Sequence, residues 1–132
     1  MIVIDTSSLV AIARREEDWL AHATALQAAD IAVISPINYV GLGILLRRHE
    51  LIADEASLKA WLRTLDVEVR DDVALSETAL AAYLAYGKGF HPDGLNLADV
   101  FAYALSKKLN APLLYTGDDF TRTDVRSVLQ PT

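Results

Sequence analysis

The sequence predicts a single α/β domain over residues 1–132, a three-layer α/β/α sandwich with a central, mainly parallel sheet. Two observations predict this class. Short apolar runs alternate along the chain with longer segments whose apolar residues recur at helical spacing, as in parallel strands joined by crossover helices. The first run, Ile2-Val3-Ile4, has no polar alternation, which is typical of a strand that helices cover on both faces.

The composition of the chain excludes several kinds of site and several functional classes. A chain of 132 residues that is 52% hydrophobic can bury one core, and the absence of cysteine excludes disulfides and thiolate metal sites. There is neither a signal peptide nor a run of about 20 apolar residues, so we expect a cytoplasmic protein without a membrane segment. The net charge of −6 argues against binding nucleic acid by overall attraction, although short basic clusters such as Arg14-Arg15 and Arg47-Arg48 could contact phosphates.

The elements follow in order along the chain. Four strands are expected, at Ile2 to Ile4, Ile31 to Ile34, Val67 to Val69 and Pro112 to Tyr115, and a fifth could lie at an edge at Ser127 to Leu129. Helical spacing predicts helices at Ser8 to Ala13, Glu16 to Ala29, Pro36 to His49, Asp54 to Leu65, Ala74 to Tyr86 and Asn96 to Asn110. Ser35 and Asn96 are the expected caps.

Histidine carries no predicted chemistry. Gly87 to Leu95 is expected to be a loop at the rim of the domain, and His91 within it a solvated residue. We expect His22 and His49 on helix surfaces.

Three acids stand at positions where an α/β sheet binds ligands. Asp5 follows the first strand, Asp118 follows the fourth, and Asp99 lies in the first turn of the helix that Asn96 caps. Each alone has a structural explanation, in a strand-to-helix turn or a capping box. If strands one and four are neighbours where the strand order reverses, however, the three carboxylates converge in one crevice.

Such a cluster requires protons or a cation. Two carboxylates about 5 Å apart repel by roughly 3 kcal/mol at an effective dielectric of about 20. Because cysteine is absent and no histidines are paired, the oxygen-loving ions Mg²⁺ and Mn²⁺ are the natural partners.

The helix expected after Ser35 contains two glycines, Gly41 and Gly43. Each costs about 0.5 to 1 kcal/mol relative to alanine in a helix interior. A packing requirement or a replaced residue is therefore to be suspected at these positions.

Four motifs, in order, carry a family resemblance. They are Ile2-Val3-Ile4-Asp5-Thr6-Ser7, Ser35-Pro36-Ile37-Asn38-Tyr39-Val40, Gly94 to Ala104 with Asp99 at its centre, and Leu114-Tyr115-Thr116-Gly117-Asp118-Asp119-Phe120. Over nearly the whole chain they resemble a PIN domain, specifically the VapC ribonuclease toxins of type II toxin–antitoxin systems. The resemblance implies an Mg²⁺- or Mn²⁺-dependent endoribonuclease, usually a homodimer, that acts on RNA and is neutralised by a VapB-type antitoxin.

The resemblance also implies roles for residues. Asp5, Asp99 and Asp118 match three of the four acids of the family's metal site, and Asp119 is the second choice for the last. Thr6 and Thr116 lie beside these acids as candidates to support them or to contact phosphate. Where the family has a glutamate after Val or Leu in the helix following strand two, this chain has Gly41. This replacement explains the helix-interior glycine and puts catalytic competence in question.

The mechanism implied is metal-assisted hydrolysis of an RNA phosphodiester. An aspartyl-phosphate phosphatase would need a second Asp where Ser7 stands, and a receiver domain would need paired acids where Thr6 follows Asp5. The alternative that stays open is a non-catalytic module that dimerises and binds an antitoxin. Apolar residues of the segment from Pro36 to Leu65 predict a dimer or antitoxin interface there, and they are Leu42, Leu45, Leu46, Leu51, Trp61 and Leu62.

Overall fold

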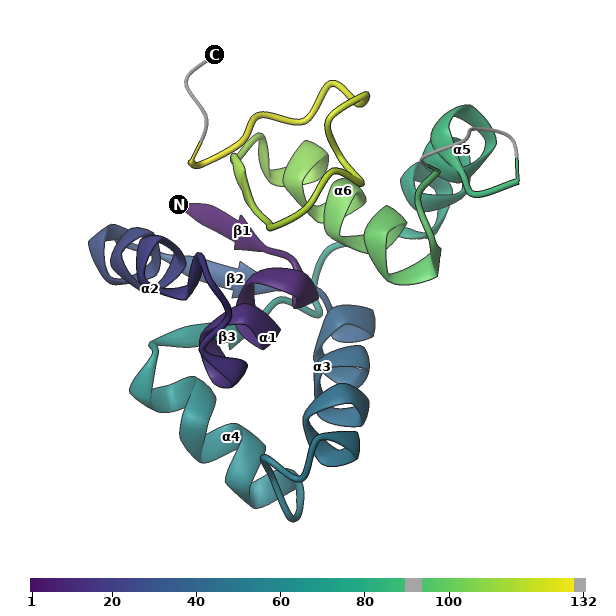
Figure 1. Ribbon diagram of the computed structural model, residues 1–132. Coiled ribbons are helices and arrows are strands. Elements are labelled where there is room, and N and C mark those ends of the chain that lie inside the picture. Colours follow the sequence, from purple (N-terminus) through teal and green to yellow (C-terminus); the bar gives the residue numbers. More distant parts are fainter. Residues whose placement is uncertain (90–93, 130–132) are drawn as a thin grey trace.

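A computed structural model describes residues 1–89 and 94–129 and shows a four-stranded sheet at the centre of the molecule (Figure 1). The strands are β1 (Ile2–Ile4), β2 (Ala32–Ile34), β3 (Val67–Val69) and β4 (Leu113–Leu114). They lie in the order β3-β2-β1-β4, and every neighbouring pair is parallel. The predicted α/β class with a parallel sheet is confirmed, and β1 and β4 are neighbours where the strand order reverses.

The helices are α1 (Thr6–Arg14), α2 (Trp19–Ala28), α3 (Pro36–Arg48), α4 (Glu55–Thr64), α5 (Ser76–Tyr86) and α6 (Leu97–Leu109). Ser35 caps α3 and Asn96 caps α6 through side-chain hydrogen bonds, as predicted. Helix α2 begins at Trp19 rather than Glu16, because Arg15 turns the chain with a left-handed φ of 54° after α1.

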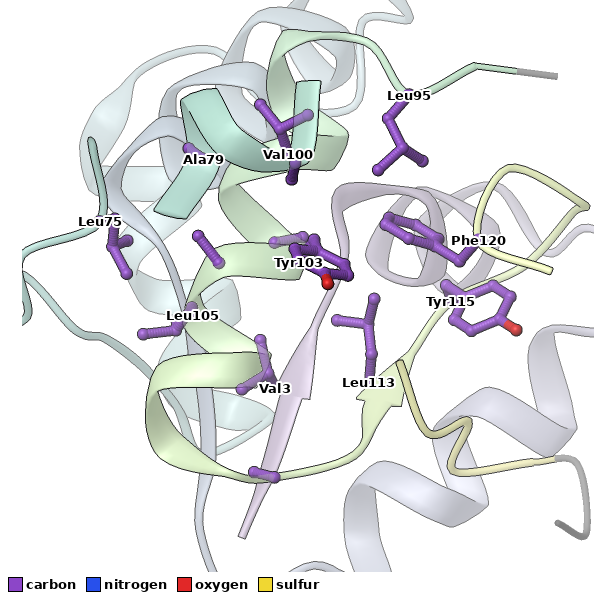
Figure 2. Packing of buried hydrophobic residues seen from close by; sticks show 14 of the residues in the cluster. Val3, Leu75, Ala79, Leu95, Val100, Tyr103, Leu105, Leu113, Tyr115 and Phe120 are labelled. Carbon is purple, nitrogen blue, oxygen red and sulfur yellow. The ribbon is translucent and has the colours of Figure 1, made fainter. Parts of the chain in front are cut away.

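The side chains of β1 show why helices cover both faces of the sheet. Ile2 and Ile4 belong to one buried cluster, whereas Val3 between them belongs to another, because successive strand residues point to opposite faces. Figure 2 shows the Val3 cluster, where α5 and α6 contribute Ala79 and Tyr103. The other cluster is filled from α1 to α4 by Leu9, Ile12, Leu26, Leu42, Leu46, Leu58 and Leu62. Two cores on either side of one sheet make the predicted three layers.

The sheet edge beyond β4 is only partly extended. Leu113 donates its backbone N–H to Arg126 and accepts from Val128, but a single bridge to Ser127 is all that forms, so the fifth strand is not completed. The predicted rim loop begins with a bridge between Gly87 and Leu95, and His91 lies outside the described residues. Within residues 1–89 and 94–129, every helix is too short or too polar to cross a membrane.

Candidate active site

Asp5 lies at the carboxyl end of β1 and is 3% exposed. It is the N-cap of α1, and its Oδ2 accepts hydrogen bonds from the backbone N–H of Ser7 at 3.0 Å and from the Ser7 hydroxyl at 2.5 Å. The other oxygen, Oδ1, is buried without a hydrogen-bond partner. Burial raises the pKa of Asp5 above its ordinary value, the bonds from Ser7 oppose this rise, and the charge of Asp119 adds to it.

Asp99 is the third residue of α6 and is 5% exposed. It forms the capping box, in which its Oδ2 accepts from the Asn96 backbone N–H at 3.0 Å while Asn96 accepts from the Asp99 backbone. Burial, followed by the charge of Asp5, raises the pKa of Asp99 to about 8. Asp119 acts in the same direction, through its charge and through a side-chain hydrogen bond. The capping role predicted for Asp99 is confirmed, and its buried carboxylate also feels the charges of Asp5 and Asp119.

The segment after β4 brings Asp119 to the other two acids. Of the two adjacent exposed acids, it is Asp119 whose charge raises the pKa of both Asp5 and Asp99. The backbone carbonyl of Asp118 instead accepts from the N–H and the hydroxyl of Thr121 and closes a turn. The sequence prediction ranked Asp118 first and Asp119 second, and of the two it is Asp119 whose charge acts on Asp5 and Asp99.

A buried amide that sequence reasoning missed connects the helices of the site. Asn38 is 1% exposed, and its Nδ2 donates to Thr6 Oγ1 at 3.0 Å and to the Ala98 carbonyl at 3.2 Å. Thr6 in turn donates to the Asn38 carbonyl at 3.3 Å. Asn38 therefore connects the first turns of α1, α3 and α6, two of which carry Asp5 and Asp99 at their starts. Thr6 thus supports the site from a buried position.

The two glycines of α3 have different surroundings. A Cβ at Gly43 would lie 3.3 Å from Leu58 Cδ2, so close packing of α3 on α4 accounts for this glycine. A Cβ at Gly41 would meet only Thr6 Oγ1, at 3.9 Å, which is ordinary contact. Packing therefore does not require glycine at position 41, and a side chain there would begin beside the buried hydroxyl that follows Asp5.

A second missed residue is His22, which the sequence pattern wrongly placed on a helix surface. The imidazole is 1% exposed and contacts Ser8 Oγ through Nδ1 at 2.8 Å and Asp18 Oδ2 through Nε2 at 3.1 Å. The same Asp18 oxygen accepts from Thr116 Oγ1 at 2.5 Å. The Asp18-x-x-x-His22 spacing, one helical turn, was the available signal, since residues four apart share a helix face.

The donor set fits a hard divalent cation in its chemistry. It offers carboxylate oxygens, one of them buried without a partner, and charges whose repulsion a cation would relieve. As they lie, however, no three Asp, Glu, His or Cys side chains of the described residues are gathered closely enough to hold a metal. Gly41, where the resemblance places a fourth acid, has no side chain beside the buried hydroxyl of Thr6.

Comparisons with known proteins agree on one family. The PIN domain model matches residues 2–126. Ribonuclease VapC30 of Mycobacterium tuberculosis is 36% identical over 131 residues, which cover 98% of this chain and 100% of that protein. Ribonuclease VapC28 of the same organism is 37% identical over 134 residues, with 97% and 98% covered.

A solved structure supports the fold. The crystal structure of Mycobacterium tuberculosis VapC20, described as a sarcin-ricin loop cleaving toxin, aligns with a TM-score of 0.73 at 19% identity and covers 99% of this chain and 100% of that one. The family and the ribonuclease class predicted from the four motifs are confirmed. The chain belongs to the PIN-domain family and, within it, to the VapC ribonucleases.

Proposed function

We propose that the chain is a toxin of a toxin–antitoxin pair that hydrolyses RNA phosphodiesters with Mg²⁺ or Mn²⁺. Asp5, Asp99 and one acid of the Asp118-Asp119 pair hold the ion, and the interactions of Asp119 with the other two favour it over Asp118. The observation that carries the proposal is the buried Oδ1 of Asp5, which has no hydrogen-bond partner at the edge where these acidic charges meet. A carboxylate is retained in such a place when an ion compensates it.

The residues of the chain prepare this site. A bound ion supplies a water of lowered pKa and offsets charge that grows on the phosphate. Ser7 fixes one oxygen of Asp5 and leaves the other without a hydrogen-bond partner, and the Asn96 backbone N–H fixes one oxygen of Asp99. The hydroxyl of Thr6 donates to the Asn38 carbonyl and that of Thr116 donates to Asp18, so both residues act as supports of the acids.

Gly41 limits the activity of the chain as it stands. A glutamate at position 41 begins beside Thr6 without a clash at Cβ and adds the missing acid. We expect the Gly41→Glu variant to bind Mn²⁺ more tightly than the natural chain in calorimetric titration and to cleave total RNA when Mg²⁺ or Mn²⁺ is present. The variant should also slow cell growth unless the antitoxin is expressed.

A matched control removes the acid while keeping its shape. Asp5→Asn in the Gly41→Glu background retains the acceptor for Ser7 but should lose metal binding and cleavage. If antitoxin-free Gly41→Glu protein cleaves no RNA and binds Mn²⁺ no better than the natural chain, the nuclease proposal fails. The non-catalytic alternative, which Gly41 itself favours, would then remain.

The predicted partner surface keeps Leu51, which is 45% exposed, and the half-buried Leu45 and Trp61, but not the other residues first named. Leu42, Leu46 and Leu62 are buried in the core and cannot contact a partner. The exposed apolar residues of α3 are Ile37, Val40 and Ile44, at 36%, 55% and 48% exposure, and Val40 and Ile44 line a groove between α3 and α4. We propose that a homodimer contact or the VapB-type antitoxin covers this surface.

A charged substitution in this groove tests whether a partner covers it. Ile44→Asp places a carboxylate in the apolar groove and should weaken dimerisation or antitoxin binding at least tenfold, by light scattering and calorimetry, without unfolding the domain. Leu129→Asp, also at an exposed apolar position, is the matched control. Unchanged assembly and antitoxin affinity in Ile44→Asp would exclude the groove.

A further inference from the structure

We propose that His22 is a positioning residue for the segment after β4. Through Asp18 it holds Thr116, and so keeps the acids at 118 and 119 in place relative to Asp5. The inference deepens the proposed function and rests on it for its consequence in metal binding. The positioning itself is a property of the metal-free chain and can be measured separately.

The first link is the buried imidazole. Both nitrogens of His22 are engaged, Nδ1 with Ser8 Oγ at 2.8 Å and Nε2 with Asp18 Oδ2 at 3.1 Å. Because a carboxylate only accepts, Nε2 carries the hydrogen toward Asp18, and in the neutral ring Nδ1 accepts from Ser8. The ring therefore orients the Asp18 carboxylate from the interior between α1 and α2.

The second link is a carboxylate in an unusual role. Asp18 is the N-cap of α2, yet its side chain makes no capping hydrogen bond. An aspartate at this position ordinarily accepts from a free N–H of the first turn. Here Oδ2 accepts instead from His22 and from Thr116 Oγ1, at 3.1 and 2.5 Å. The Asp18 carboxylate therefore leaves the start of α2 without a side-chain cap and instead connects this helix to the segment after β4.

The third link shows why this segment needs holding. Strand β4 has two residues, and Gly117, Asp118 and Asp119 after it are exposed. Thr116 is fixed on two sides, since its backbone N–H donates to Ser7 Oγ at 3.2 Å and its hydroxyl donates to Asp18. Ser7 Oγ in turn donates to Asp5 Oδ2. The two sets of bonds meet at Thr116 and set the acid-bearing turn against Asp5.

Aromatic packing holds the two residues that flank this turn. The rings of Tyr115 and Phe120 lie with centroids 4.9 Å apart and flank the exposed acids, and Figure 2 shows them side by side at the end of β4. Packing thus fixes both ends of the turn. The hydrogen bonds of Thr116 are what orient the exposed residues between them.

The contacts from Ser8 to His22 and from His22 to Asp18 also match those of a Ser-His-Asp nucleophilic triad, but the structure excludes that function. Ser8 is 0% exposed, so no substrate can reach its hydroxyl. The carboxylate end of the series is the half-exposed one, and it points to Thr116. These three residues therefore fix the segment after β4 relative to the buried core.

Amide hydrogen exchange of the metal-free protein tests the positioning, with Thr116 as the probe and Ala104 in α6 as the reference. His22→Leu should speed exchange at Thr116 at least tenfold relative to Ala104, and His22→Gln, which keeps a donor for Asp18, should restore most of the protection. Thr116→Val, which keeps the branched shape and the backbone N–H, should reproduce the His22→Leu effect even if the latter folds poorly. Tyr83→Phe, which loses a bond from α5 to the Lys88 carbonyl, should not affect Thr116.

The consequence for the site is measured in the Gly41→Glu background. There His22→Leu should raise the Mn²⁺ dissociation constant about 10- to 100-fold, and His22→Gln should recover it. Equal loosening of Thr116 and Ala104, no rescue by His22→Gln, or unchanged Mn²⁺ affinity would overturn the proposal. If Gly41→Glu itself binds no Mn²⁺, the proposed function fails, and the exchange at Thr116 alone decides the role of His22.

Discussion

The metal-free protein should become less stable as pH rises from 5 to 8, and Asp99→Asn should remove most of this dependence. Asp99 has a folded-state pKa of about 8, well above the ordinary value of 3.8 for an aspartate. Between these values the unfolded chain is ionised at this position while the native state still binds the proton, so stability falls with rising pH until Asp99 itself ionises near pH 8. Asparagine keeps an oxygen for the Asn96 backbone N–H and carries no charge.

The size of the effect follows from the same numbers. One proton bound only by the native state gives a slope of at most about 1.4 kcal/mol per pH unit, and the interval of roughly 4 pH units bounds the total at about 6 kcal/mol. The repulsion that Asp99 shares with Asp5 and Asp119 is about 3 kcal/mol for a pair about 5 Å apart at an effective dielectric of about 20. We therefore expect Asp99→Asn to gain about 2 to 4 kcal/mol at pH 8.

Urea unfolding followed by circular dichroism, at half-unit steps from pH 5 to 8 with chelator present, measures this gain. Other acids, such as Asp18 and Asp124, have lowered pKa values and lose their stabilising effect only at more acidic pH, whereas Asp5, whose pKa is also raised, accounts for the slope that Asp99→Asn leaves. Asp124→Asn is the control and should keep the slope of the natural chain. Parallel pH profiles for the natural chain and Asp99→Asn would refute the electrostatic account of the site.

Two further predictions concern the frame around the acids. Asn38→Ala should lower the free energy of unfolding by about 2 to 4 kcal/mol in urea titrations, because it removes the bonds to Thr6 and the Ala98 carbonyl and leaves buried groups unpaired. A loss below about 0.5 kcal/mol would contradict the linking role of this amide. Gly41→Ala should be stabilising by about 0.5 to 1 kcal/mol, and by more than Gly43→Ala, whose new methyl group would meet Leu58. Thermal unfolding of the two variants side by side checks the order, and the reverse order would contradict the packing described for α3.

The parts of the fold that the sequence predicted are those that depend on local pattern. The unbroken apolar character of Ile2 to Ile4 indicated a strand buried on both faces, and the two core clusters of β1 bear this out. Ser35 and Asn96 mark helix starts because their short polar side chains accept from the first turn. The segment from Ser127 failed as a strand because strand pairing is a tertiary property that apolar character alone does not guarantee.

The buried polar contacts of the site cannot be predicted from local sequence pattern. Asn38 and His22 each lie on a helix whose pattern allows either a surface or an interior position, and only the packing of another helix decides between them. The burial of His22 is possible because Ser8 of α1 and Asp18 at the start of α2 pair both of its nitrogens, a condition that depends on how these two helices pack. The choice between Asp118 and Asp119 likewise depends on the turn after β4, whose conformation the sequence pattern does not specify.

The state of this site follows from what surrounds Gly41. A site that had lost its role could also lose the buried polar bonds that hold it, since each is costly to keep when left unpaired. Here Thr6, which lies beside the glycine, keeps its bonds to Asn38, Ser35 keeps its bond to Asn38, and Asp5 retains an unpartnered buried oxygen. In the proposed site the glycine leaves out one acidic side chain, whereas the bonds that hold Asp5 and Asp99 are present. For this reason a single substitution, Gly41→Glu, is expected to be sufficient, without compensating changes in α1, α3 or α6.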